Sequence, residues 1–261
     1  MYLETLKLSF NQNSIYSANI ILTIIGSIIS VVVQMSLWAV LMQNGVLESN
    51  VSLNNMIQFT IINSIIATLT SANIESVIAQ KVRDGSIGID FIRPINLKFF
   101  LFSDAIGNNL FKLLFCSAPV CIFAIVFYEF SLPATPIMFS VFLVALALGL
   151  AISFEISYIF AMLAFWMETV WFISWYTRAL YTLLGGSFIP VWFYPPFLVN
   201  ISKVFPFYYV AFAQISIYTG KETLQSSIKI LLTQGVWLLV LWGLEKVIWW
   251  RAQKMIMVTG G

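Results

Sequence analysis

Long apolar segments recur along the whole chain, separated by shorter and more polar stretches. A helix needs about 20 largely apolar residues to cross the hydrocarbon core of a bilayer, and six segments approach or exceed that length. They are Asn19 to Leu41, Asn54 to Ala72, Leu110 to Phe130, Ile137 to Phe165, Val170 to Trp192 and Ile228 to Trp250. The pattern predicts an all-α membrane protein with six transmembrane helices.

The second segment is the most polar of the six. Its isoleucines are interrupted by amide and hydroxyl side chains, namely Asn54, Asn55, Gln58, Asn63, Ser64, Thr68 and Thr70. Such groups are costly against lipid, so this helix is expected inside the bundle. Hydrogen bonds between packed helices and the lining of a passage both remain open as reasons for the polar side chains.

The start of the chain has the pattern of a short helix that lies on a membrane surface. Leu3, Leu6 and Phe10 recur at near-helical spacing, while Glu4 and Lys7 fall on another face. Residues 1–17 are therefore predicted to hold an interfacial helix on the cytoplasmic side.

The stretch between the fifth and sixth segments, residues 190–227, is rich in proline and aromatic residues. Its prolines interrupt any long helix, and aromatic side chains prefer the headgroup level of a membrane. The prolines are Pro190, Pro195, Pro196 and Pro206. Short re-entrant helices that dip into the outer leaflet without crossing it are the expected structure.

Composition supports one membrane domain over residues 1–261. Of the residues, 60% are hydrophobic and 9% are charged, which leaves too few polar side chains to cover a water-soluble protein of this size. The net charge of +2 gives no indication of nucleic-acid binding. Histidine is absent from the sequence, and with it the commonest general base and metal ligand.

The placement of lysine and arginine sets the predicted orientation. With six crossings and the N-terminus inside, eight basic residues fall on the cytoplasmic side and three on the other. Those on the cytoplasmic side are Lys7, Lys81, Arg83, Arg93, Lys98, Lys246, Arg251 and Lys254. Those opposite are Lys203, Lys221 and Lys229. This excess places both termini in the cytoplasm.

The connection of residues 75–100 is the only sizeable cytoplasmic loop that this topology gives. Its first part can be helical as far as Asp84, with Gly85 as the C-terminal stop. That helix would expose Gln80, Lys81, Arg83 and Asp84 at the membrane surface. A docking surface for a cytoplasmic partner and an ordinary positively charged loop are both compatible with the pattern.

Two charged residues lie deep within predicted crossings. Glu155 and Arg178 each lie about eight to ten residues from the cytoplasmic ends of the fourth and fifth segments, so their depths are similar. Because an isolated charge at that depth costs about 3 kcal/mol or more, the two are predicted to form a buried ion pair. The pair can serve transport or only fix the helix register.

Several short motifs resemble the membrane-spanning permease subunits of type-two ABC exporters, in particular a bacterial branch of roughly 260-residue permeases. The motifs are Arg83 to Pro94, Ala164 to Glu168, Gly185 to Pro190 with Tyr194-Pro195, Phe205 to Phe207, Trp249 to Arg251, and Gly260-Gly261. The resemblance covers nearly the whole chain. Gly88, between Gly85 and Asp90, departs from the family pattern.

This resemblance implies a non-catalytic permease in a bacterial cell membrane, with a coupling helix between the second and third crossings. It implies two ATP-binding subunits per complex, a second permease chain that is identical or homologous, and surrounding lipid as partners. ATP and Mg²⁺ would be bound by the partner ATPase. The sequence agrees, because its only Gly-Lys pair, Gly220-Lys221, lacks the remainder of a phosphate-binding loop.

Two other function classes compete with the exporter permease. A membrane-embedded enzyme is disfavoured, because the sequence shows neither paired acidic residues on one helix nor a nucleophile with a plausible base. A carrier driven by an ion gradient is the alternative function, but inverted repeats and helices broken near the midplane are not apparent.

Overall fold

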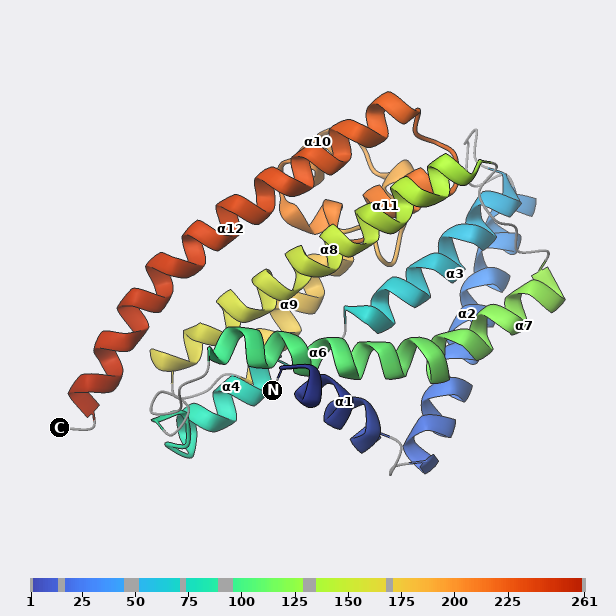
Figure 1. The fold of residues 1–261 in the computed structure, drawn as a ribbon. Helices are drawn as coiled ribbons and strands as arrows, with labels where there is room; N and C mark the ends of the chain where they lie inside the picture. The colour runs from blue at the N-terminus through green and yellow to red at the C-terminus, as the bar shows by residue number, and fades with distance from the viewer. Residues whose placement is uncertain are drawn as a thin grey trace.

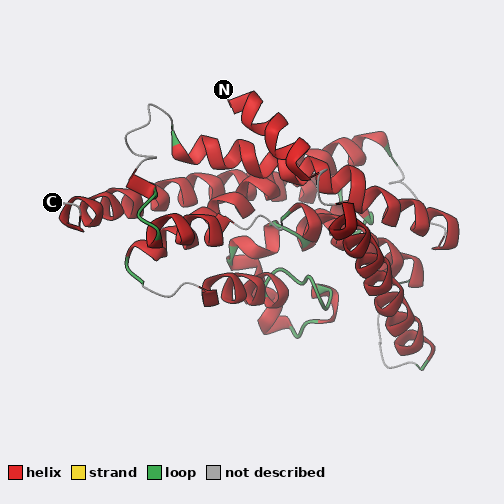
Figure 2. Cartoon of the chain, turned by 90° about the horizontal axis from the view of Figure 1, so that it is seen from below, coloured by secondary structure: helices red, strands yellow, loops and turns green. Residues whose placement is uncertain are grey.

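The structure, a computed structural model, describes residues 2–13, 17–44, 52–70, 74–88, 96–128, 135–167 and 171–259. Within these ranges every regular element is helical and none is a strand (Figure 2). The predicted all-α fold class is confirmed.

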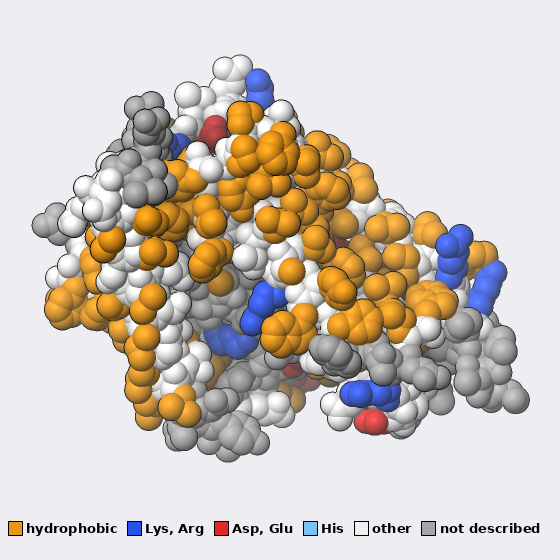
Figure 3. All heavy atoms as spheres, turned by 180° about the vertical axis from the view of Figure 1, so that it is seen from behind, with side chains coloured by type: hydrophobic (Ala, Val, Ile, Leu, Met, Phe, Trp, Pro, Cys, Tyr) orange, Lys and Arg blue, Asp and Glu red, His pale blue; other side chains and the backbone are white. Residues whose placement is uncertain are grey.

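Among the described residues, five helical stretches are long and apolar enough to cross a membrane. They are Ile20–Gln43, Leu53–Arg83 (which includes residues 71–73, outside the described ranges), Leu97–Tyr128, Pro136–Phe165 and Leu224–Lys254. Each overlaps one of the predicted crossings. A pair of helices bent by 82°, Pro196–Val204 and Pro206–Tyr218, would add a sixth if it were counted as one span. The chain is therefore a multi-pass membrane protein, and the face in Figure 3 shows broad hydrophobic areas with few charged side chains.

The predicted fifth crossing, Val170 to Trp192, is shorter than expected. Its helix α9 covers Trp171–Leu183, about 20 Å at 1.5 Å per residue, which does not span a core of about 30 Å. The helix ends where Gly186 turns the chain with a φ of +65°. The long helices α8 (Pro136–Met162) and α12 (Leu224–Thr259) run in the same direction (Figure 1), so α9 and the residues after it make the return between them.

The third crossing consists of α6 (Leu97–Lys112), the π-helical turn η1 (Leu113–Ser117) and α7 (Ala118–Tyr128). Pro119 has no N–H group to donate to the carbonyl four residues earlier. The wider turn just before this proline accommodates the interruption, so the helix continues through it.

Short helices fill the region between α9 and α12, in agreement with the prediction for residues 190–227. They are η3 (Val191–Phe193), α10 (Pro196–Val204), η4 (Pro206–Tyr209) and α11 (Phe212–Tyr218). Every residue of α11 is buried, and α11 packs against α8 and α3 (Leu53–Leu69). Their position relative to the outer leaflet stays a prediction.

Two buried amide side chains connect this region to the long helices. Gln234 of α12 donates from Nε2 to the carbonyl oxygens of Tyr209 (2.8 Å) and Ala145 (3.0 Å). Gln214 of α11 donates to the same Tyr209 carbonyl at 3.2 Å. Gly149 of α8 faces Gln214, where a side chain would overlap the amide. A buried hydrogen-bond network therefore holds α8, α11 and α12 together.

The predicted N-terminal helix is present as α1 (Tyr2–Asn13), which packs along α6 (Figure 1). Ser9 is buried there and its hydroxyl lies 2.5 Å from Asp104 Oδ1. The Phe10 ring packs edge-on against Phe111, with centroids 5.5 Å apart. Leu3, predicted on the apolar face, is 75% exposed, because the side of α1 that contains Ser9 and Phe10 faces α6. The placement of α1 at a membrane interface remains a prediction.

Substituting Gly107 is expected to loosen α1. A Cβ at this position in α6 would overlap the Leu6 carbonyl oxygen and lie 3.0 Å from Ser9 Cβ. Overpacking costs about 1–3 kcal/mol, so Gly107→Ala should speed hydrogen exchange of the α1 amides about tenfold or more. Hydrogen exchange followed by mass spectrometry measures this change. Gly26→Ala is the control, since nothing lies within 4 Å of that position, and equal exchange in both variants would contradict the prediction.

Candidate functional site

The first candidate is the surface helix α4 (Ile74–Arg83), which follows α3 along the chain. Ile74, Ile78 and Ala79 are buried, and the helix packs against α8 and α9. Gly85, with a φ of +70°, follows the helix, and its N–H donates to the Val82 carbonyl at 3.2 Å. The predicted helix and its glycine stop are therefore present.

The polar residues predicted on this helix lie together at its C-terminal end. Gln80, Arg83 and Asp84 are exposed, while Lys81 is half-buried with its Nζ 5.9 Å from the centre of the Phe100 ring. One side of α4 thus contacts the transmembrane helices, and the other side presents charged and amide groups. The remainder of the connection, residues 89–95, lies outside the described residues, together with its Arg93-Pro94 pair.

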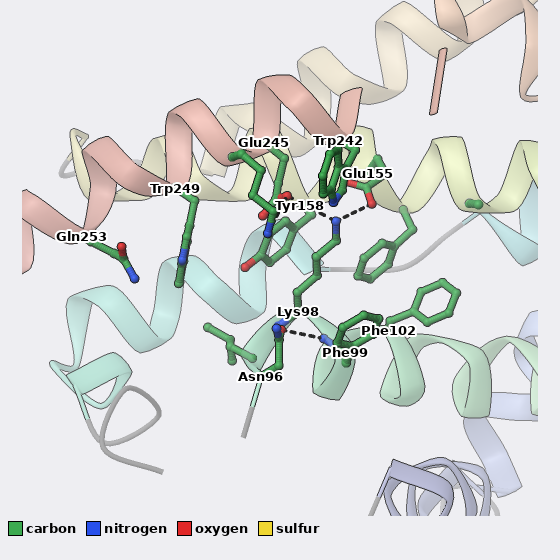
Figure 4. A pocket seen from close by; sticks show the side chains of 14 residues that line it. Asn96, Lys98, Phe99, Phe102, Glu155, Tyr158, Trp242, Glu245, Trp249 and Gln253 are labelled. Atoms are coloured by element: carbon green, nitrogen blue, oxygen red, sulfur yellow. Dashed lines mark hydrogen bonds and ion pairs between the residues drawn. The ribbon is translucent and has the colours of Figure 1, made fainter. Parts of the chain in front are cut away.

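A second candidate is a cluster of charged side chains from three helices (Figure 4). Lys98, in the first turn of α6, places Nζ 2.5 Å from Glu155 Oε1 and 3.5 Å from Glu245 Oε2. Glu155 belongs to α8 and Glu245 to α12, and the two carboxylate side chains are 12% and 3% exposed. Lys246 approaches Glu245 at 3.8 Å from a half-exposed position. A single ammonium group therefore bridges two buried carboxylates.

This cluster corrects the predicted partner of Glu155. The structure describes both Glu155 and Arg178, and it pairs Glu155 with Lys98, whereas Arg178 lies on an exposed part of α9 and lines a different cavity. The sequence predicted a similar depth for Glu155 and Arg178, but two side chains at the same depth need not be neighbours. Lys98 reaches Glu155 because α6 begins beside α8 and its lysine has a long, flexible stem.

The charged cluster lies in a cavity of about 690 Å³ between α6, α8 and α12. Aromatic side chains supply much of its wall, as Figure 4 shows. These are Phe99, Phe102, Phe154, Tyr158, Trp242 and Trp249. The cavity thus combines buried charge with apolar walls, an arrangement typical of sites for small molecules.

A third candidate is a more polar cavity of about 480 Å³ between α3, α4, α8 and α9. Its wall includes Asn63, Glu75, Ser157, Arg178 and Tyr181. Asn63, from the polar second crossing, donates from Nδ2 to the Ser187 carbonyl at 2.6 Å. Gln58 and Asn63 of α3 are therefore buried as predicted, whereas Asn54 at the start of the helix is exposed. Asn63 both makes a contact between segments and lines a cavity.

Sequence reasoning missed Glu245, Lys98 and Glu75, three of the charged residues that line these cavities. Glu245 lies inside the predicted sixth crossing, so its depth was an available signal. In the sequence, Lys98 is only a charge that sets the orientation, and Glu75 is only the start of a connection. The last two had no local signal, because a side chain at the end of a helix is buried or exposed according to what packs beside it.

The described residues contain no group of three or more acidic or cysteine side chains that could hold a metal ion. In the cavity between α6, α8 and α12 the acidic residues contact lysine side chains, so charge pairing is the interaction that this cavity shows.

Residues 40–260 match the family described as ABC-2 family transporter protein. The match covers most of the chain, including α4 and both cavities. No curated protein matches the sequence.

Proposed function

The chain belongs to the ABC-2 family of transporter proteins, and we propose that it serves as the permease subunit of an ATP-driven exporter moved by separate ATPase subunits. The complex would contain two ATP-binding subunits, which hold ATP and Mg²⁺, and a second permease chain, identical or homologous. It would lie in a bacterial cell membrane with both termini in the cytoplasm, according to the distribution of basic residues.

The main support for this proposal is that α4 has one buried side and one exposed side. Its buried side packs against α8 and α9, so a force applied to α4 reaches the membrane-spanning helices directly. Its exposed Gln80, Arg83 and Asp84 can form hydrogen bonds and ion pairs with another protein. A partner that binds two conformations of the permease with different affinity shifts their populations, which is sufficient for energy transfer.

The exposed side of α9 supports the presence of a second permease chain. Ser174, Arg178 and Thr182 are spaced by four residues, so they lie along one face of the helix, and all three line the polar cavity. A charged side chain within a membrane avoids lipid and faces protein or water. In the proposed complex this face of α9 lines the substrate passage together with the second permease.

The test of the proposal is a double substitution at the C-terminal end of α4, Arg83→Ala with Asp84→Ala. Because both side chains are exposed, the stability of the isolated permease should change by less than about 0.5 kcal/mol. Copurification of the ATPase subunits and ATP-driven transport in vesicles should each fall about tenfold, a loss equivalent to about 1.4 kcal/mol of coupling. Subunit retention and transport assays measure the two effects.

The matched control replaces a basic and an acidic residue by alanine at the opposite end of the molecule, Lys221→Ala with Glu222→Ala. This pair precedes α12 and lies far along the chain from α4, so it should leave ATPase retention unchanged. Full retention and unchanged transport in the α4 variant would refute the assignment of α4 as the coupling helix.

A further inference from the structure

The Lys98 ammonium group lies in surroundings that suit an ammonium ligand. Two carboxylates hold it, at 2.5 Å and 3.5 Å, and its Nζ lies 5.9 Å from the centre of the Tyr158 ring. Carboxylates and aromatic faces are the two kinds of group that stabilise organic cations in proteins. The cavity thus already binds one ammonium group, which is attached to the chain itself.

The same cavity contains a hydrogen-bond acceptor that is not satisfied. Glu155 Oε2 is buried and has no hydrogen-bond partner among the described residues, although Oε1 of the same carboxylate contacts Lys98. A buried carboxylate oxygen without a partner is costly, so a donor that enters the cavity gains a favourable contact. A primary ammonium has three N–H groups and can use this oxygen together with an oxygen of Glu245.

The walls of the cavity favour an apolar group attached to that ammonium. Phe102, Phe154 and Trp249 line the cavity, and its volume of about 690 Å³ exceeds the needs of a small amine. Trp242 and Phe99 are both cavity residues and both more than half exposed, at 52% and 57%. The cavity wall is therefore continuous with the hydrophobic outer surface, through which a molecule dissolved in lipid can enter.

Charge balance in the cavity implies that a bound cation displaces the Lys98 ammonium group. Glu155 and Glu245 are compensated by Lys98 and by the half-exposed Lys246, so an added cation requires another to leave. The long stem of Lys98 lets its ammonium swing away without moving the backbone. An anionic headgroup would instead meet two buried carboxylates, which disfavours it strongly.

We propose that the cavity between α6, α8 and α12 binds an amphipathic molecule through a primary ammonium group, in the place that Lys98 fills when the cavity is empty. Displacement of Lys98 frees the start of α6 from α8 and α12, directly after the connection that contains α4. Binding itself is independent of the transport function. That the bound molecule is the exported cargo rests on the proposed function above.

The test uses the full chain in maltoside micelles, which contain no ammonium groups. A fluorescent alkylammonium probe is titrated and its anisotropy measured, beside a probe with the same chain and a sulfonate headgroup. The ammonium probe should bind saturably, and Glu155→Gln should weaken it about tenfold or more, because a hydrogen bond to a charged group contributes about 1.5–3 kcal/mol. Glu222→Gln removes a carboxylate outside the cavity and should have no effect.

A second measurement uses a different variant, so the test does not depend on correct folding of Glu155→Gln alone. Lys98→Met removes the internal ammonium, so dodecylammonium should raise the melting temperature of this variant more than that of the wild type, as chemical rescue. Dodecyl sulfonate should not produce this difference. Equal binding of the two probes, or unchanged ammonium binding in Glu155→Gln, would overturn the proposal.

Competition with lipid separates two sources of the ammonium group. If phosphatidylethanolamine displaces the probe and phosphatidylglycerol does not, the natural occupant is an aminophospholipid of the membrane. If neither lipid competes, the occupant is an amphipathic amine that is foreign to the bilayer. Both results support the ammonium site. Failure of the ATPase-retention test leaves these binding results unchanged, so the two proposals fail separately.

Discussion

Replacing Lys98 by methionine is expected to lower the free energy of unfolding by about 3–5 kcal/mol. The substitution leaves Glu155 and Glu245 buried without the cation that lies between them, at 2.5 Å and 3.5 Å from their oxygens. Two neighbouring carboxylates in an apolar cavity repel each other, and neither can be fully hydrated. Unfolding in mixed micelles of increasing sodium dodecyl sulfate content, followed by circular dichroism, measures the loss.

Two control variants distinguish loss of the bridge from loss of charge in general. Lys246→Met removes a side chain that is 54% exposed and 3.8 Å from Glu245, so its effect should stay below about 1 kcal/mol. Lys98→Met combined with Glu155→Gln and Glu245→Gln should recover most of the stability, since no buried charge is then unpaired. Equal losses for Lys98→Met and Lys246→Met would show that the bridge does not stabilise the bundle.

Replacing Gly149 by alanine is expected to destabilise the protein by about 1–3 kcal/mol through overpacking. The added methyl group would overlap the amide of Gln214, which is fully buried, and lie 3.2 Å from the Tyr209 carbonyl oxygen. Gln214 cannot move aside without losing its hydrogen bond to that carbonyl. The same unfolding titration measures the effect.

Gly243→Ala in α12 is the matched control for this substitution. Nothing lies within 4 Å of a Cβ at that position, and alanine is favoured over glycine in a helix by about 1 kcal/mol. Gly243→Ala should therefore be neutral or stabilising. A loss of stability in Gly243→Ala as large as that in Gly149→Ala would show that a general property of helical glycines, and not the Gln214 contact, is responsible.

The sequence by itself determined the helical class and most of the crossings. Hydrophobicity over about 20 residues is a local property, because each crossing must satisfy its own backbone hydrogen bonds and match the bilayer. The end of α4 just before Gly85 was predictable for a similar reason, because a backbone position in the left-handed conformation after a helix favours glycine. The polar pattern of α3 likewise predicted that Asn63 faces the interior.

The sequence did not determine which side chains meet across the bundle. Position along a helix fixes the depth of Glu155 and Arg178, but it does not fix the direction in which a side chain points or which helix lies beside it. Lys98 became the partner of Glu155 through the packing of α6 against α8 and α12, contacts between segments separated by many residues. The burial of α11 also depended on such packing.

The cavity with the ammonium site was likewise determined partly by the sequence and partly by the packing of the helices. Hydropathy identified the helices that carry its residues, and a charge within an apolar helix could have identified Glu245. Only the tertiary structure decided that Glu155, Glu245 and Lys98 share one cavity, because its walls come from three helices that are distant in sequence. The periodicity of each helix constrains which of its faces is buried, whereas a site between helices requires their relative rotation and height, and these are set by side-chain packing over the whole bundle.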